Sequence, residues 1–169
     1  MLIRPERPSD TAEISSLTYA AFLNHPQHTP GALPTEHKIV DALRDANALT
    51  ISLVTKDDGL LVGHVAFSPV CISNEDQGWF GLGPVSVLPE RQRKGIGSAL
   101  IRKGLELLKE RGARGCVLVG DPAYYSRFGF RACDNLVLEG VPPEVFLYLA
   151  FGGENPTGTA TFHDAFGAH

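Results

Sequence analysis

Residues 82–111 constrain the fold of this chain more than any other segment. An apolar stretch ends at Pro89, a basic turn containing Gly95 and Gly97 follows, and apolar residues then recur at the spacing of one helical face. The pattern predicts a strand, a turn and a helix. Glycine lets the backbone approach a ligand, and the first amides of a helix have no partner within it. A phosphate or pyrophosphate suits these amides, the helix dipole and the basic side chains of the turn, which are Arg91, Arg93 and Lys94.

The turn differs from two familiar phosphate-binding motifs. It lacks the Gly-Lys-Ser/Thr of a nucleoside-triphosphate loop and the third glycine of a dinucleotide fingerprint. The alternative interpretation of these residues alone is a tight turn with solvated basic side chains. Pro84, inside the preceding strand, cannot donate to a strand ladder, so it predicts a bulge or a broken pairing there.

Two motifs carry a family resemblance. Gln92-x-x-Gly95-x-Gly97 after a strand, followed later by Tyr125-Ser126-Arg127-Phe128-Gly129-Phe130, resembles the coenzyme-A-binding core of the GCN5-related N-acetyltransferase (GNAT) family. Residues 81–84 and 121–125 are similar to bacterial predicted acetyltransferases of that family. The resemblance covers residues 60–130, is weaker in the first helices and is absent from the end of the chain. It implies an α/β (α+β) acyl-CoA N-acyltransferase fold, in which about four helices flank a mixed, mostly antiparallel sheet of about seven strands with a V-shaped splay between strands 4 and 5.

The resemblance also implies a donor site for acetyl-CoA as cosubstrate. The backbone of Val85 and Val87 would hold the pantetheine arm where the two strands splay. The pyrophosphate would lie on the turn, held by Gln92, Arg93, Lys94, Gly95, Gly97 and Ser98.

Tyr125 stands where many family members place a general acid beside the thioester sulfur. Because a thiol with a pKa of about 8.5 is already a fair leaving group, we expect this proton donor to contribute only about 10² in rate. The alternative is that Tyr125 is a core residue whose hydroxyl reaches the rim.

The base that deprotonates an amine is harder to predict. Family members often use a glutamate on strand four, but residues 79–88 contain no carboxylate. We place Asp121 and His64 first, ahead of His25, Glu75 and Asp76. The structural alternatives are a helix cap for Asp121, a hydrogen-bonded core residue for His64 and solvated turn residues for Glu75 and Asp76.

The composition of the chain limits which partners, compartments and cofactors are expected. A formal net charge of -4 argues against a nucleic-acid partner. The widely spaced Cys71, Cys116 and Cys133 predict buried free thiols in a reducing compartment, hence a cytoplasmic protein. We expect no membrane segment, because no apolar run approaches the length of a membrane span. We also expect no metal, because the histidines at 25, 28 and 37 lack cysteines or paired carboxylates at ligand spacing.

One N-acetyltransferase domain is expected over residues 1–151, with a C-terminal extension over 152–169 that is an edge strand, a homodimer contact or partly disordered.

A capping box at Asp10 and Glu13 predicts a helix ending near Phe22, and Thr35 is placed to cap a second helix through residue 46. Strands are predicted at residues 2–4, 49–55, 60–70, 79–88, 116–119, 136–138 and 145–151, with a polar turn at 74–78 and a short helix from 122. The long loop at 23–34, the region around Asn74 and the end segment are predicted to form the acceptor pocket.

These expectations favour an enzyme that moves the acetyl group of acetyl-CoA to a primary amine of a small molecule or peptide, by direct attack in a ternary complex. The alternative is a non-catalytic sensor or assembly module that binds acetyl-CoA or CoA. A module of that kind has no need for a hydroxyl at Tyr125, so this residue favours the enzyme. A hydroxyl or thiol acceptor is a third possibility.

Overall fold

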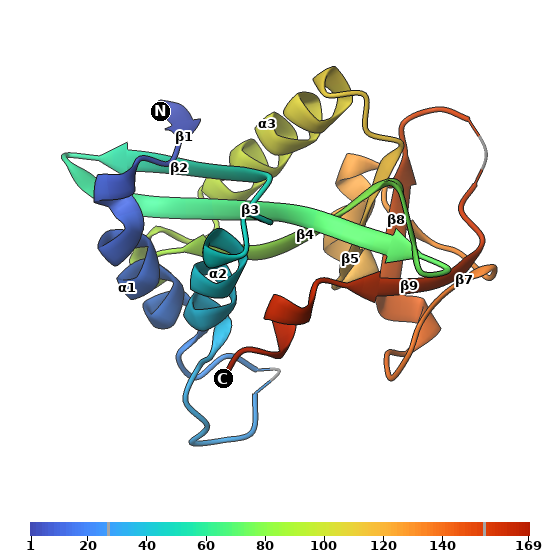
Figure 1. The fold of residues 1–169 in the computed structure, drawn as a ribbon. Helices are drawn as coiled ribbons and strands as arrows, with labels where there is room; N and C mark the ends of the chain where they lie inside the picture. The colour runs from blue at the N-terminus through green and yellow to red at the C-terminus, as the bar shows by residue number, and fades with distance from the viewer. Residues whose placement is uncertain (27, 154) are drawn as a thin grey trace.

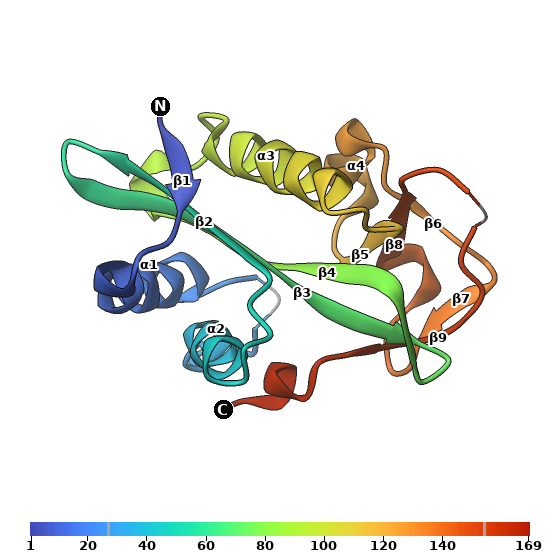
Figure 2. The ribbon, with the colours of Figure 1, turned by 45° about the horizontal axis from the view of Figure 1, so that its top comes forward.

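The computed structural model describes residues 1–26, 28–153 and 155–169. One nine-stranded sheet runs through the molecule, and helices cover both of its faces (Figures 1 and 2). The main strand order is β1 (Ile3–Pro5), β2 (Ile51–Asp57), β3 (Leu60–Ile72), β4 (Glu75–Val87), β5 (Gly115–Val119), β8 (Phe146–Ala150) and β6 (Arg131–Ala132). At the far end of β3, the sheet is extended by β9 (Gly158–Phe162) and β7 (Leu136–Leu138).

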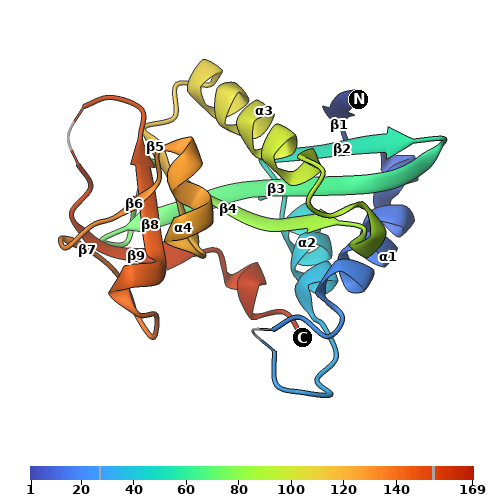
Figure 3. The ribbon, with the colours of Figure 1, turned by 180° about the vertical axis from the view of Figure 1, so that it is seen from behind.

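The helices form two layers. The first helices lie together on one face, and Figure 3 shows the other two on the opposite face, with α3 across β3 and β4 and α4 beside β8. The first layer consists of α1 (Thr11–Phe22) and α2 (Glu36–Asp45), and the second of α3 (Ile96–Glu110) and α4 (Pro122–Tyr125). A short 3-10 helix, Asp164–Gly167, packs beside α2 near the C-terminus. The predicted mixed, mostly antiparallel fold with four helices is confirmed, with nine strands where about seven were expected.

The pairing between β4 and β5 is short. The two strands run parallel and pair only at Trp79 with Gly115, Phe80 with Cys116, and Gly81 with Val117. Beyond Gly81 the strands separate, which is the splay that the family resemblance implied. On its other edge β4 stays paired with β3, but the register shifts where Pro84 stands. The bulge predicted from Pro84 is therefore present, and it lies where β4 parts from β5.

Close packing fixes α3 over the sheet. Gly104 of α3 lies against the fully buried ring of Phe67 on β3, and a Cβ atom at Gly104 would lie 2.1 Å from that ring. Gly63 of β3 is similarly close to Ile96, at the first turn of α3. These contacts leave no room for side chains at the two glycines, so the start of α3 is held next to the end of β4.

Three local predictions were wrong. Strand β4 begins at Glu75 rather than after a polar turn, because the turn is confined to Ser73 and Asn74, both with positive φ, and Glu75 already pairs with β3. Strand β6 was not predicted, since its two residues carry too short a pattern. The Asp10 carboxylate does not cap α1. It accepts hydrogen bonds from the Arg4 guanidinium at 2.8 and 3.1 Å and from the Arg7 amide at 2.7 Å, because an Arg4 cation is within reach.

Glu13 also has a different role from the predicted one. Its carboxylate accepts a hydrogen bond from the Leu61 amide at 2.9 Å and so joins α1 to the start of β3. Thr35 occupies the N-cap position of α2 without a side-chain cap bond. Residues 158–162 form strand β9, which pairs with both β3 and β7 and is therefore an inner strand, not the edge strand that was one of the alternatives for the C-terminal extension. The division of the chain at residue 151 stays a prediction.

Candidate functional site

A long groove runs along the free edge of β4 and over the start of α3. It consists of two adjoining cavities of about 730 Å³ and 440 Å³. The two cavities share five lining residues: His25, Val87, Gln92, Gly97 and Tyr124. Val85 and Tyr125 line the smaller cavity, and the turn before α3 lines the larger one. The groove therefore joins the splay to the basic turn.

The turn exposes backbone amides to the larger cavity. Gly95 is the N-cap of α3 and has a left-handed backbone with φ of 84°, which favours glycine, and Arg93 is also left-handed. Among the residues that the structure describes, no side chain caps the first amides of α3. The Gln92 amide group donates to the Val87 carbonyl at 3.1 Å, which ties the turn to the end of β4. Unpaired amides at the positive end of a helix dipole form a site for an anion.

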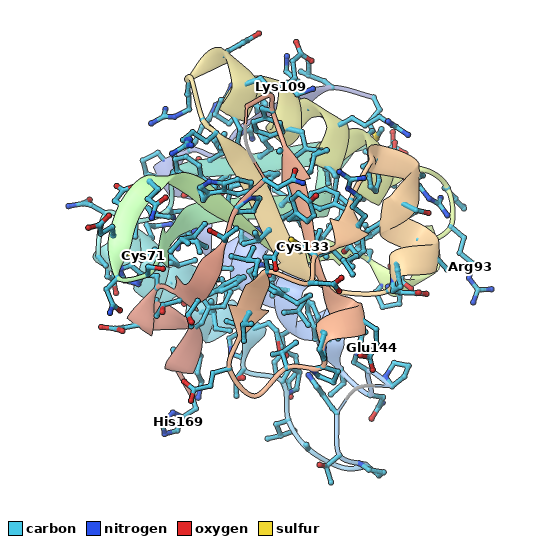
Figure 4. All side chains as sticks on the ribbon, turned by 90° about the vertical axis from the view of Figure 1, so that its right-hand side faces the viewer. Cys71, Arg93, Lys109, Cys133, Glu144 and His169 are labelled. Carbon is cyan, nitrogen blue, oxygen red and sulfur yellow. The ribbon has the colours of Figure 1, made fainter. Side chains whose placement is uncertain are left out.

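The residues predicted for the turn are mostly found together. Gln92, Arg93, Gly95, Gly97 and Ser98 line the larger cavity. Lys94 is exposed and lies outside the lining, and Figure 4 shows the Arg93 side chain projecting outward beside α4. The charge of Arg91 is shared with Asp57, with which it forms an ion pair.

Sequence reasoning missed two groups that face the turn. The Tyr124 hydroxyl lies 3.1 Å from Ser98 Oγ, and Arg127 lies over the Tyr124 ring at 4.2 Å from its centroid. The Arg127 Nε atom also donates to the Tyr124 carbonyl at 2.8 Å. Arg127 therefore adds a positive charge to the larger cavity from the short 3-10 helix Ser126–Phe128 that follows α4. The signal for it was the three-residue spacing, which places Tyr124 and Arg127 on one side of a helical turn.

Tyr125 lies at the splay, in the lining of the smaller cavity with Val85 and Val87. Its ring fills the space over Gly120, where a Cβ atom would lie 2.5 Å from the ring. Burial raises the pKa of Tyr125 to about 12, and neighbouring Tyr124 adds to this effect. Within the described ranges no protein group is hydrogen-bonded to the Tyr125 hydroxyl. The side chain is thus both a packing residue and a neutral hydroxyl facing the cavity.

A third cavity, which we call the apolar cavity, lies on the other side of the splay. It has a volume of about 490 Å³ and is bordered by the segment of β4 beyond the last β5 pair, Leu82, Gly83 and Pro84, and by Val119 at the end of β5. It shares Phe22 and His25 with the smaller cavity of the groove. Two compartments with mostly different linings therefore meet at the splay.

The walls of the apolar cavity correspond only in part to the predicted acceptor pocket. The loop after α1 contributes through His25 and His28, and the end segment contributes through Phe162 and Phe166. Asn74 lies in the β3–β4 turn and outside this lining. The segment after β7, which contains Glu139, lines the cavity instead of the region around Asn74.

His64 lies away from all three cavities, inside the layer between the sheet and the first helices. Its side chain is fully buried, and Nε2 lies 2.8 Å from Ser52 Oγ. Because the Ser52 hydroxyl donates to Glu6, His64 must donate from Nε2, which leaves Nδ1 without a hydrogen-bond partner among the described residues. Burial lowers the pKa of His64 to about 4. The imidazole is therefore a neutral core group, and we assign it no part in the site.

The remaining base candidates fall into two groups. Asp121 is exposed and accepts a hydrogen bond from the Ala123 amide at 2.9 Å, which makes it the N-cap of α4. Glu75 and Asp76 are exposed at the start of β4. None of these three carboxylates lines the groove or the apolar cavity. His25, by contrast, lines both cavities of the groove and the apolar cavity.

Other features restrict the chemistry of the described residues. All three cysteines are free thiols, but only Cys116 is buried, so the prediction of three buried thiols was wrong for Cys71 and Cys133. Burial raises the pKa of the Cys116 thiol. Within residues 1–26, 28–153 and 155–169, no cluster of three metal-ligating side chains is present, and no helix is both long and apolar enough to span a membrane.

Comparison with known proteins agrees with this arrangement. Residues 2–133 match the family model of the acetyltransferase (GNAT) domain. YhbS of Escherichia coli K12, an uncharacterized N-acetyltransferase, is 40% identical over 131 residues, which make up 77% of this chain and 73% of that protein. These matches show that the chain belongs to the GNAT family of acetyltransferases.

Two solved structures are similar over nearly the whole chain. A GNAT family acetyltransferase from Brucella melitensis, in complex with acetyl-CoA, is 52% identical with a TM-score of 0.85, over 98% of this chain and 97% of that one. YhbS from E. coli, in complex with CoA, is 34% identical with a TM-score of 0.87, over 98% of this chain and 91% of that one. The likeness extends to β9 and the end segment, beyond the part matched by the family model.

The buried His64 predicts a specific dependence of stability on pH. The unfolded chain binds a proton at this histidine near pH 6.5, whereas the folded protein does not until about pH 4. The free energy of unfolding should therefore fall by about 1.4 kcal/mol per pH unit as the pH is lowered across this range. Urea unfolding at several pH values measures this change in the free energy of unfolding. A His64→Asn variant should have a flatter profile in this window, and an equally steep profile in the variant would contradict the assignment.

Proposed function

We propose that this protein transfers the acetyl group of acetyl-CoA to a primary amine, by direct attack of the amine on the thioester in a ternary complex. The observation that carries the proposal is the meeting of two compartments at the splay, since the groove and the apolar cavity share Phe22 and His25. A donor in one compartment and an acceptor in the other would bring their reacting atoms together there. The complexes of the similar proteins with acetyl-CoA and CoA support this choice of donor.

The donor would lie along the groove. In this proposal the first amides of α3 bind the pyrophosphate, with Gln92, Arg93, Lys94, Gly95, Gly97 and Ser98 around it and Arg127 adding charge from the 3-10 helix after α4. The backbone of Val85 and Val87 holds the pantetheine arm, because β4 is no longer paired with β5 beyond Gly81. A strand-like contact at this edge places the thioester beside Tyr125.

The reaction requires two polar groups near the thioester. The amine nitrogen attacks the carbonyl carbon, the C–N bond forms and the C–S bond breaks. The proton that the nitrogen then loses goes to the departing thiolate, so coenzyme A leaves as the thiol. An amide of the bulged β4 segment, at or near Val85, would stabilise the oxyanion. Tyr125 faces the sulfur. Because its pKa of about 12 lies well above that of a thiol, about 8.5, Tyr125 stabilises the thiolate mainly as a hydrogen-bond donor.

A base must also take a proton from the amine, which is an ammonium ion in neutral solution. Of the candidates considered, His25 has the position that this role needs, since it borders both compartments. We assign the role to His25, acting directly or through water. Asp121 keeps a capping role, and His64 is buried elsewhere.

The proposal includes a cytoplasmic protein acting on a small-molecule or peptide amine. The three free thiols support a reducing compartment. A homodimer stays a prediction from the sequence.

The direct test measures thiol release from acetyl-CoA across a panel of primary amines, beside a calorimetric titration of the same donor. Release that depends on an amine is expected. Tight donor binding without release for any amine, alcohol or thiol would favour the non-catalytic CoA-binding module. Release only with alcohols or thiols would replace the acceptor class, and absence of donor binding would overturn the groove assignment.

Gly97→Glu tests the donor site. A Cβ atom at Gly97 would lie 3.6 Å from Val87 and 3.8 Å from the Tyr124 hydroxyl, which are ordinary contacts, so Gly97→Ala should keep its affinity for CoA. A glutamate would place bulk and negative charge toward the pyrophosphate and should weaken CoA binding by about 100-fold or more. Gly97→Gln separates bulk from charge. Unchanged affinity in Gly97→Glu, with the fold intact by circular dichroism, would refute the assignment.

Tyr125→Phe tests the hydrogen bond from the Tyr125 hydroxyl to the departing sulfur. Turnover should fall by about 10²-fold, while the affinity for CoA stays near normal because the ring still packs over Gly120. Stopped-assay rates from pH 6 to about 9 measure the loss, which should be similar throughout because Tyr125 stays protonated over this range. Tyr19→Phe is the matched control, since Tyr19 lines none of the three cavities. An unchanged rate in Tyr125→Phe would reduce Tyr125 to a packing residue.

A further inference from the structure

The composition of the apolar cavity limits which amines can enter it. Three phenylalanine rings come to it from separate parts of the chain: Phe22 from the end of α1, Phe162 from β9 and Phe166 from the last short helix. The Phe162 and Phe166 rings meet edge to face with centroids 5.1 Å apart. Ile39, Leu138 and Val141 complete these walls. A cavity lined in this way gains free energy by taking up an apolar group.

The permanently charged side chains that line the cavity are acidic. Glu36 and Glu139 are its carboxylates, and no lysine or arginine is among the described residues that line it. Glu36 is 15% exposed, and its Oε1 atom lies 3.0 Å from His28 Nε2. An ammonium group is therefore attracted to the cavity, whereas a carboxylate on the ligand would find no lysine or arginine to pair with.

The apolar cavity lies next to the place proposed for the thioester. Leu82, Gly83 and Pro84 border it on the stretch of β4 that precedes Val85, which lines the groove. Val119 borders it from the separated end of β5 and is 47% exposed. A ligand whose body lies among the phenylalanines can thus direct its amine toward the splay.

Resting on the proposed function, we propose that the acceptor is a primary amine carried on an apolar body of about the size of a phenyl ring, with no carboxylate beside the amine. Polyamines and aminoglycosides are poor acceptors, because their several charged or hydroxylated groups would be desolvated against apolar walls. Free amino acids are poor acceptors, because their carboxylate would lie near Glu36 and Glu139 without a cation.

Four commercial amines test this proposal in the thiol-release assay. Phenethylamine has the proposed chemistry, ethanolamine lacks the apolar body, phenylalanine adds a carboxylate, and phenylalaninamide replaces that carboxylate with a neutral group of the same size. The value of kcat/KM should be about 50-fold higher for phenethylamine than for ethanolamine, from burial of the ring. Phenylalaninamide should be accepted, and phenylalanine should be at least about tenfold worse than its amide.

A charge introduced at the rim provides an independent test. Val119→Lys should raise the KM for phenethylamine about tenfold by repelling the ammonium group, and should narrow the difference between phenylalanine and its amide. Val137→Lys is the matched control, because Val137 is 53% exposed on β7 but does not line the cavity. Both variants should bind CoA as the parent protein does.

The outcomes separate this inference from the proposed function. Release with ethanolamine that equals or exceeds release with phenethylamine overturns the inference and leaves the acetyltransferase standing. Equal rates for phenylalanine and phenylalaninamide overturn the charge argument. If the donor binds and no amine gives release, the proposed function fails and the acceptor assignment fails with it.

Discussion

The structure depends on a broken strand pairing. Strands β4 and β5 pair only as far as Gly81 and Val117, and then separate where the bulge at Pro84 redirects β4. One edge of β4 is thereby left without a β5 partner inside an otherwise continuous sheet. The groove and the apolar cavity lie on either side of this gap, so the proposed meeting of donor and acceptor follows from how the sheet is built. Closing the gap would remove both compartments at once.

The elements around this gap are fixed in position by close packing on one face of the sheet and by hydrogen bonds on the other. Gly104 and Gly63 let α3 lie directly on β3, which sets the first turn of the helix beside the end of β4. On the opposite face, the buried chain of hydrogen bonds from His64 through Ser52 to Glu6 lies in the layer under α1 and α2. Burial disfavours the charged form of Glu6, but hydrogen bonds from Arg44 and Ser52 outweigh this and lower its pKa. These polar groups therefore stabilise the packing of the first helices on the sheet, and we assign them no part in the reaction.

Sequence reasoning predicted what is encoded locally. The strand, turn and helix around Gly95 and the bulge at Pro84 depend on neighbouring residues, and the structure confirms them. The apolar cavity could not be predicted in the same way, because its walls come from segments that meet only in the folded chain. The base candidates could not be ranked by their place in the fold for a related reason. Sequence position does not show that His64 is buried beneath the first helices, or that His25 borders both compartments. The roles of the site residues stay predictions until they are tested.

A crystal structure of the protein with acetyl-CoA bound would show where the thioester lies. We expect the pyrophosphate on the first amides of α3, the pantetheine arm along Val85 and Val87, and the acetyl group beside Tyr125, facing the apolar cavity through the gap between β4 and β5. An acetyl group that is separated from the apolar cavity by a continuous protein wall, or a donor bound outside the groove, would contradict this expectation.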